Sequence, residues 1–92
     1  MPANGPLRTT VVVANPNGLH MRPATAFAQT ARTYRAAVTV YNGDRRADGK
    51  SSLDLILLIA EPGAELVLEV DGEDAGTAIE PLAALLAAVE AQ

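Results

Sequence analysis

The sequence of 92 residues contains no cysteine or tryptophan, one phenylalanine and one histidine. Without cysteine the chain can form neither a disulfide nor a thiolate metal site, as is typical of proteins from a reducing cytoplasm. No apolar run is long enough to cross a bilayer, and the first residues lack the basic and apolar segments of a signal peptide. We therefore expect a cytoplasmic protein that does not insert into a membrane.

Basic side chains are absent from the last part of the chain. All seven Lys and Arg residues lie within positions 1–50, whereas eight of the eleven Asp and Glu residues lie within positions 61–92. A net charge of −4 and few aromatic residues argue against nucleic-acid binding, while the basic half suits an acidic partner or a bound anion. With one histidine and no carboxylates at ligand spacing, we expect no metal, and nothing indicates another cofactor.

Hydrophobic residues make up 49% of the chain, which suits one globular domain with one core. We expect residues 1–6 to form a flexible tail and residues 7–92 to form the domain. Alternating and β-branched residues predict four strands, the third weakly marked: 7–14, 36–41, 44–47 and 64–70. Asn42-Gly43 predicts a hairpin turn between the two middle strands.

Two segments have a clear helical pattern. Apolar residues at spacings of three and four predict a helix over 21–32, and a longer amphipathic pattern predicts one over 75–89. Pro81 lies inside the last helix and predicts either a kink or a helix in two pieces. The apolar stripe of the first helix consists of Ala24, Phe27, Ala28 and Ala31.

The segment after Lys50 fits two structures. Ser51-x-x-Asp54 has the form of a capping box with Asp in place of Glu or Gln, and Pro62-Gly63 ends the segment. We expect a helix over 52–60, although its apolar run also suits a buried strand. A helix that is apolar on nearly every side is either fully buried or leaves one face for a partner.

The predicted order of elements is β-α-β-β-α-β-α. Strict alternation and a tight hairpin indicate a mostly antiparallel sheet with helices on one face, which is an α+β sandwich.

The single histidine lies where a turn meets a helix. The letters NPNG predict the turn, which places His20 at the N-cap of a helix that begins at about Met21. The amides of the first helical turn and the helix dipole favour an anion there, phosphate above all. Arg22 adds a cation whose planar donors match phosphate oxygens. Pro23 loses no hydrogen bond in the first turn, and it biases Arg22 away from helical geometry.

Imidazole is largely neutral, and hence nucleophilic, near neutral pH. His20 therefore suits the role of a phosphoryl acceptor held against backbone donors and a cation. The alternative from the residues alone is a histidine that caps the helix or is merely solvated.

Residues 15–27, NPNGLHMRPATAF, closely resemble the active-site segment of the HPr family, the histidine-containing phosphocarriers of the bacterial phosphoenolpyruvate:sugar phosphotransferase system. The resemblance extends from about residue 7 to residue 90, because VTVYNG, GKSS and GAELVLEVDGEDA follow in the family's order and spacing. The motif positions that match are Gly18, Leu19, His20, Arg22, Pro23 and Ala24.

The resemblance implies an open-faced β-sandwich, in which a four-stranded antiparallel sheet is covered by three helices. It implies that His20 takes a phosphoryl group on Nδ1 from enzyme I and passes it to an enzyme IIA domain. Arg22 would stabilise the transferring group, and Asn17 and Pro23 would support the site. Such a protein is a transfer intermediate rather than a turnover enzyme. A regulatory HPr-like module of an incomplete phosphotransferase system, acting through protein contacts, is the alternative.

The resemblance also points to a second site, at the serine after Lys50. In many relatives an HPr kinase/phosphorylase phosphorylates this serine, here Ser51. Asp54 departs from the family pattern, since a carboxylate there would repel a phosphate. Ser51 is therefore either a regulatory site or a plain N-cap. Partner docking is expected around Leu53 and Ile56, and we expect a monomer.

Overall fold

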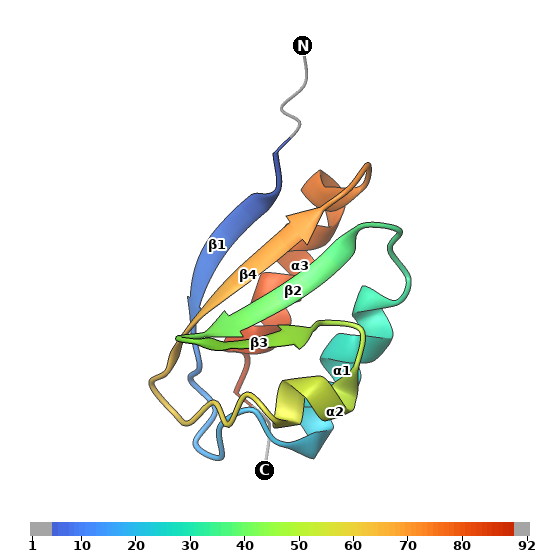
Figure 1. Ribbon diagram of the computed structural model, residues 1–92. Coiled ribbons are helices and arrows are strands. Elements are labelled where there is room, and N and C mark those ends of the chain that lie inside the picture. The colour runs from blue at the N-terminus through green and yellow to red at the C-terminus, as the bar shows by residue number, and fades with distance from the viewer. Residues whose placement is uncertain (1–4, 90–92) are drawn as a thin grey trace.

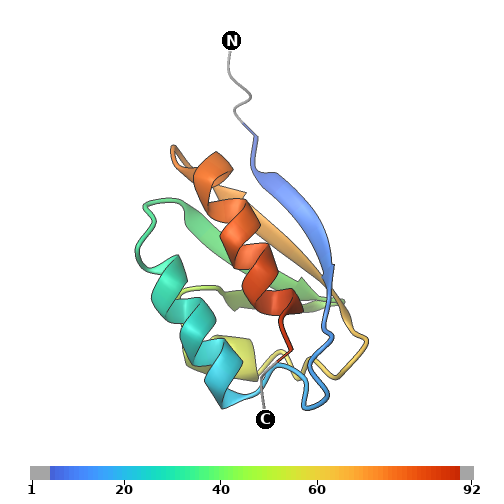
Figure 2. The ribbon, with the colours of Figure 1, turned by 180° about the vertical axis from the view of Figure 1, so that it is seen from behind.

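The computed structural model describes residues 5–89. They form one four-stranded sheet in the order β1-β4-β2-β3, in which each neighbouring pair is antiparallel. Figure 2 shows α1 and α3 across one face of this sheet, with the short α2 beside the start of α1. The α+β sandwich expected from the sequence is confirmed. The elements, labelled in Figure 1, are β1 (Leu7–Val12), α1 (Met21–Ala31), β2 (Ala37–Asn42), β3 (Arg45–Asp48), α2 (Ser52–Ile56), β4 (Glu65–Asp71) and α3 (Ala75–Ala87).

Residues 1–4 of the expected tail lie outside the described residues. No helix within residues 5–89 has both the length and the apolar character needed to span a bilayer.

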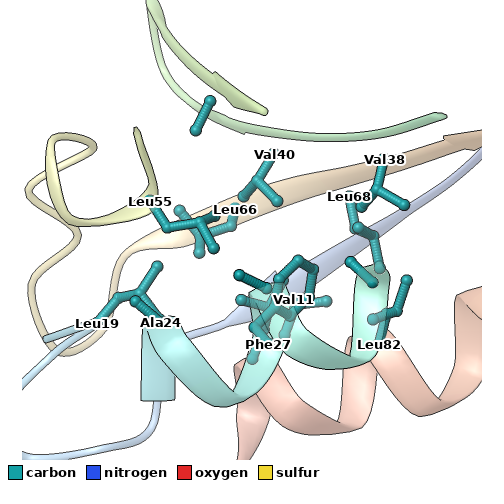
Figure 3. Packing of buried hydrophobic residues seen from close by; sticks show 14 of the residues in the cluster. Val11, Leu19, Ala24, Phe27, Val38, Val40, Leu55, Leu66, Leu68 and Leu82 are labelled. Carbon is teal, nitrogen blue, oxygen red and sulfur yellow. The ribbon is translucent and has the colours of Figure 1, made fainter. Parts of the chain in front are cut away.

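The core lies between the sheet and the helices (Figure 3). The predicted apolar stripe of α1 is confirmed, because all four of its residues are buried. Phe27, the one phenylalanine of the chain, lies in this core and has no exposed surface. In β4 every second residue faces this core, since Leu66, Leu68 and Val70 are fully buried while the residues between them are not.

The other face of the sheet carries no helix (Figure 1). There the carboxylate of Glu69 accepts hydrogen bonds from the guanidinium of Arg8 at 2.7 Å and from the hydroxyl of Tyr41 at 3.0 Å. The bond from Arg8 is the main cause that lowers the pKa of Glu69, and the bond to Glu69 is the main cause that raises the pKa of Tyr41. Val12, which is 50% exposed, lies on the same face of the sheet. The charged and hydroxyl groups on this face allow it to be exposed to solvent.

The second helix is shorter than predicted and is not a strand. It ends at Ile56, because the amides of Leu58 and Ile59 bond to carbonyls three residues earlier and Ile59 then takes a left-handed conformation with φ +52°. Its predicted capping box forms only in part. The hydroxyl of Ser51 accepts from the amide of Asp54 at 3.2 Å, but the Asp54 carboxylate accepts from the amide of Asp48 at 3.1 Å.

The last helix is a single helix, Ala75–Ala87, with Pro81 inside it. The prediction of two separate pieces is therefore wrong, whereas the predicted kink stays a prediction. Pro81 has no N–H to donate to the carbonyl of Thr77, four residues earlier. Thr77 and Pro81 are both exposed, so this carbonyl can bond to water.

The loop between α1 and β2 is fastened to the start of α3. The carboxylate of Asp74 accepts from the amides of Arg35 and Ala36, both at 2.8 Å. The bond from Arg35 is the first cause of a lowered pKa at Asp74. Although Asp74 is the N-cap residue of α3, its side chain makes no capping bond, because it is committed to this loop.

Candidate functional site

His20 is the N-cap residue of α1, as predicted. Its backbone is extended, with φ −98° and ψ −169°, and its carbonyl accepts the first helical bond from the amide of Ala24 at 3.0 Å. The imidazole does not serve as the cap acceptor and is partly exposed. A ring in this position can meet a partner protein while it stays fixed to the end of a helix.

The helix start next to His20 is well suited to an anion. The amides of the first turn have no acceptor inside the helix, and the dipole places partial positive charge there. The first turn contains no acidic side chain that would compete for this charge. Met21 and Arg22 are both exposed within this turn.

Arg22 has helical backbone geometry. The expectation that Pro23 turns Arg22 away from helical geometry is therefore wrong. Pro23 is the third residue of α1, and the bond from Ala24 to His20 holds the turn around it. The local preference of a residue before proline is overridden by this bond and by the burial of Ala24.

The turn before His20 is held from two directions. The amide of Gly18 bonds to the carbonyl of Asn15 at 2.9 Å, which closes the predicted turn with exposed Asn17 inside it. The amide of Leu19 bonds to the carbonyl of Ala60, also at 2.9 Å. Gly18 has φ +71°, and a Cβ atom there would fall against the Ala60 carbonyl oxygen. The segment after α2 thus fixes the turn that carries His20.

Two features of this turn have no local signal in the sequence. The contact with Ala60 joins positions far apart in the chain, and no local pattern signals it. Asn15 begins the predicted turn, but only 2% of it is exposed, and its side-chain oxygen and nitrogen have no hydrogen-bond partner among residues 5–89. A polar residue followed by proline gives no sign that its side chain will be buried.

An apolar surface lies along α2 and the residues that follow it. Leu53 is 65% exposed, and Leu57 and Ile59 are each 59% exposed. Ile56, which we expected to dock a partner, is only partly exposed because it packs against the core. Met21, at the start of α1, is 63% exposed. We call Met21, Leu53, Leu57 and Ile59 the apolar surface.

Residues 5–89 contain no group of three His, Cys, Asp or Glu side chains that could hold a metal ion. A cavity of about 610 Å³ lies beside β2 and β3, where Arg35, Arg46 and Lys50 line it together with Asp54, and His20 is not part of it. His20 is instead partly exposed at the N-terminal end of α1.

Comparison with known proteins agrees with this geometry. Residues 7–88 match the family model described as "PTS HPr component phosphorylation site". This chain belongs to the HPr family. The family comprises phosphocarriers of the phosphotransferase system, and the resemblance in the sequence is confirmed.

HPr proteins of similar length are among the relatives. The phosphocarrier protein HPr of Neisseria meningitidis serogroup A is 36% identical over 80 residues, which cover 87% of this chain and 90% of that protein. A crystal structure of HPr from Bacillus anthracis has a TM-score of 0.84 and 30% identity, and the match covers 90% of this chain and 99% of that one.

HPr sequences also occur inside longer proteins. The multiphosphoryl transfer protein of Xanthomonas campestris is 39% identical over 80 residues, which are 87% of this chain but 10% of that protein.

Proposed function

We propose that this protein accepts a phosphoryl group on Nδ1 of His20 from phosphorylated enzyme I and passes it to enzyme IIA domains in the cytoplasm. The observation that carries the proposal is the position of His20, which is the N-cap of α1 and immediately precedes exposed Arg22. This placement supports a site that combines a nucleophilic ring with the amides of a helix start, and Arg22 in the first turn supplies a cation.

The transfer needs no net movement of a proton. The lone pair of Nδ1 attacks phosphorus while Nε2 of His20 keeps its proton. The P–N bond to the donor histidine breaks, and its electron pair stays on the donor ring, whose other nitrogen is already protonated. The donor ring becomes neutral and the positive charge passes to the ring of His20. The same step in reverse, toward an acceptor histidine, delivers the group onward.

The protein's own contribution is to orient the ring and to balance charge. The amides at the start of α1 face the negative oxygens of the bound group, and each such charge–dipole contact contributes about 0.3–1 kcal/mol. Arg22 offers two parallel donors to phosphoryl oxygens. We assign Asn17 and Pro23 supporting roles, because Asn17 lies in the closed turn and Pro23 in the first turn of α1.

The test is uptake of labelled phosphate from phosphoenolpyruvate in the presence of enzyme I. We expect the wild-type protein to gain one acid-labile phosphate, and the variant His20→Ala to gain none. Ser51→Ala is the matched control and should be labelled normally. Labelling of His20→Ala at the wild-type level would refute the assignment.

Ser51 is the second candidate for phosphorylation, and the observed contacts favour its role as an N-cap. Its hydroxyl oxygen is engaged by the amide of Asp54. The Asp54 carboxylate lies in the same first turn of α2, where it would repel a phosphate on Ser51. We propose that an HPr kinase/phosphorylase with ATP labels the wild-type chain poorly and labels Asp54→Gly well, with Ser51→Ala as the blank. Efficient labelling of the wild-type chain would contradict this.

A further inference from the structure

The chain turns sharply after α2 at a residue poorly suited to the turn. Ile59 has φ +52° and is the one non-glycine residue among residues 5–89 with positive φ. A β-branched residue is rare in this region, because its Cβ atom crowds the backbone. Burial does not offset this strain, since 59% of Ile59 is exposed to solvent. Glycine would make the same turn without strain.

The residues on both sides of Ile59 are anchored. Leu58 is 1% exposed and Ala60 is 5% exposed. The Ala60 carbonyl accepts the amide of Leu19, the residue before His20, at 2.9 Å. Two buried neighbours thus hold the Ile59 side chain outward, beside the turn that carries the proposed phosphoryl acceptor.

The position of Ile59 lies within reach of any protein that exchanges phosphate directly with His20. In direct transfer Nδ1 of His20 must approach the donor's phosphorus atom in line with the P–N bond that breaks, so the donor protein covers the surface around His20. Ile59 is part of the apolar surface defined above, and the Leu19–Ala60 bond joins the residue after Ile59 to the residue before His20.

We propose that Ile59 is a docking residue for the phosphohistidine-bearing donor protein, and that its side chain is present there at the expense of fold stability. This inference rests on the proposed function and adds a residue that determines affinity for the donor. With 59% of its surface exposed, Ile59 removes less apolar area from water in the folded monomer than it would under a partner.

The experiment compares Ile59→Gly and Ile59→Asn with the wild-type protein. Both replacements tolerate positive φ, and both remove the apolar side chain. For Ile59→Gly we expect the Tm to rise by about 4–8 °C. For both variants the KM of enzyme I for this protein should rise about tenfold, with kcat little changed.

A small donor separates docking from chemistry. Phosphoramidate transfers its phosphoryl group to histidine with loss of ammonia and needs no docking surface. Labelling of His20 by phosphoramidate should therefore proceed at the wild-type rate in both variants. Val12→Thr is the matched control, because Val12 is 50% exposed but lies on the uncovered face of the sheet. It should leave the KM for enzyme I unchanged.

Each outcome is decisive. An unchanged KM in both Ile59 variants, or a lower Tm in Ile59→Gly, overturns the inference while the wild-type phosphate uptake still supports the phosphocarrier function. Slow labelling by phosphoramidate in Ile59→Gly would show that the turn shapes His20 itself, which also overturns a docking role. If enzyme I does not label the wild-type protein at all, the proposed function fails and this inference fails with it.

Discussion

At the scale of single residues, the site depends on the absence of a Cβ atom at Gly18. Gly18 leaves room for the Ala60 carbonyl, and this close approach lets Leu19 donate its amide to the same oxygen. His20 follows directly, so a shift of the turn changes the direction in which the ring enters the helix start.

We predict that Gly18→Ala damages both stability and function. A Cβ atom at φ +71° that meets the Ala60 carbonyl forces the turn to move. The expected loss is about 1–3 kcal/mol in the free energy of unfolding, measured by denaturant titration. Phosphate uptake from enzyme I should slow as well. Gly63→Ala is a control, since Gly63 has positive φ but no atom near its missing Cβ. Equal effects of the two replacements on uptake would contradict this prediction.

Arg22 allows a test of charge against geometry. We expect Arg22→Ala to slow phosphate uptake roughly 10²–10³-fold, the range for loss of one donor to a transition-state anion. Arg22→Lys should fall between, because lysine keeps the charge but lacks the planar pair of donors. Arg46→Ala changes the net charge equally on β3, and its uptake should match the wild type. An Arg46→Ala variant as slow as Arg22→Ala would mean that overall charge is what matters.

At the scale of elements, the ends of helices do most of the positioning. The start of α1 carries His20, the end of α2 supports the turn before it, and the start of α3 holds the loop after α1 through Asp74. These ends meet side chains and carbonyls from distant parts of the chain, and each such contact ties one helix to another segment of the fold.

The clamp at Asp74 predicts a dependence of stability on pH. Because folding lowers the pKa of this carboxyl group, chiefly through the amide of Arg35, its contribution is present at neutral pH. The contribution is lost as the pH falls below the ordinary value for Asp and through the lowered value of the folded state. Thermal unfolding should therefore show Asp74→Ala less stable than wild type at neutral pH. The difference should shrink in acid, and a constant difference would argue against the clamp.

The sequence predicted the elements with local patterns and failed where distant contacts decide. The stripe in α1 and the N-cap position of His20 follow from spacing and from the preceding turn, and both are confirmed. The early end of α2 depends on the left-handed Ile59 and on the bond from Leu19 to Ala60, which local propensity cannot reveal. Asp54 fits the letters of a capping box, yet its carboxylate accepts a hydrogen bond from the backbone amide of Asp48.

At the scale of the whole molecule, one core connects every helix to the sheet. Phe27 is fully buried among residues from both layers (Figure 3). A domain of this size has a small net free energy of unfolding, so a loss of packing at the centre of the core destabilises the whole domain.

We predict that Phe27→Ala lowers the free energy of unfolding by about 3–5 kcal/mol, because it leaves a cavity at the centre of the core. Unfolding should remain a single transition, with equal calorimetric and van't Hoff enthalpies. Leu53→Ala, which removes a 65% exposed side chain, should change the free energy by no more than about 0.5 kcal/mol. Two separate transitions in the wild-type protein would contradict a single domain.

The amide hydrogen of Leu19, which bonds to the Ala60 carbonyl, reports on the contact between two segments of the chain. That hydrogen can be replaced by deuterium only when the turn before the histidine and the chain after α2 come apart. Its replacement rate therefore measures how often the pair separates in the resting protein. A docked partner that bridges both segments would slow the replacement without touching the amide itself.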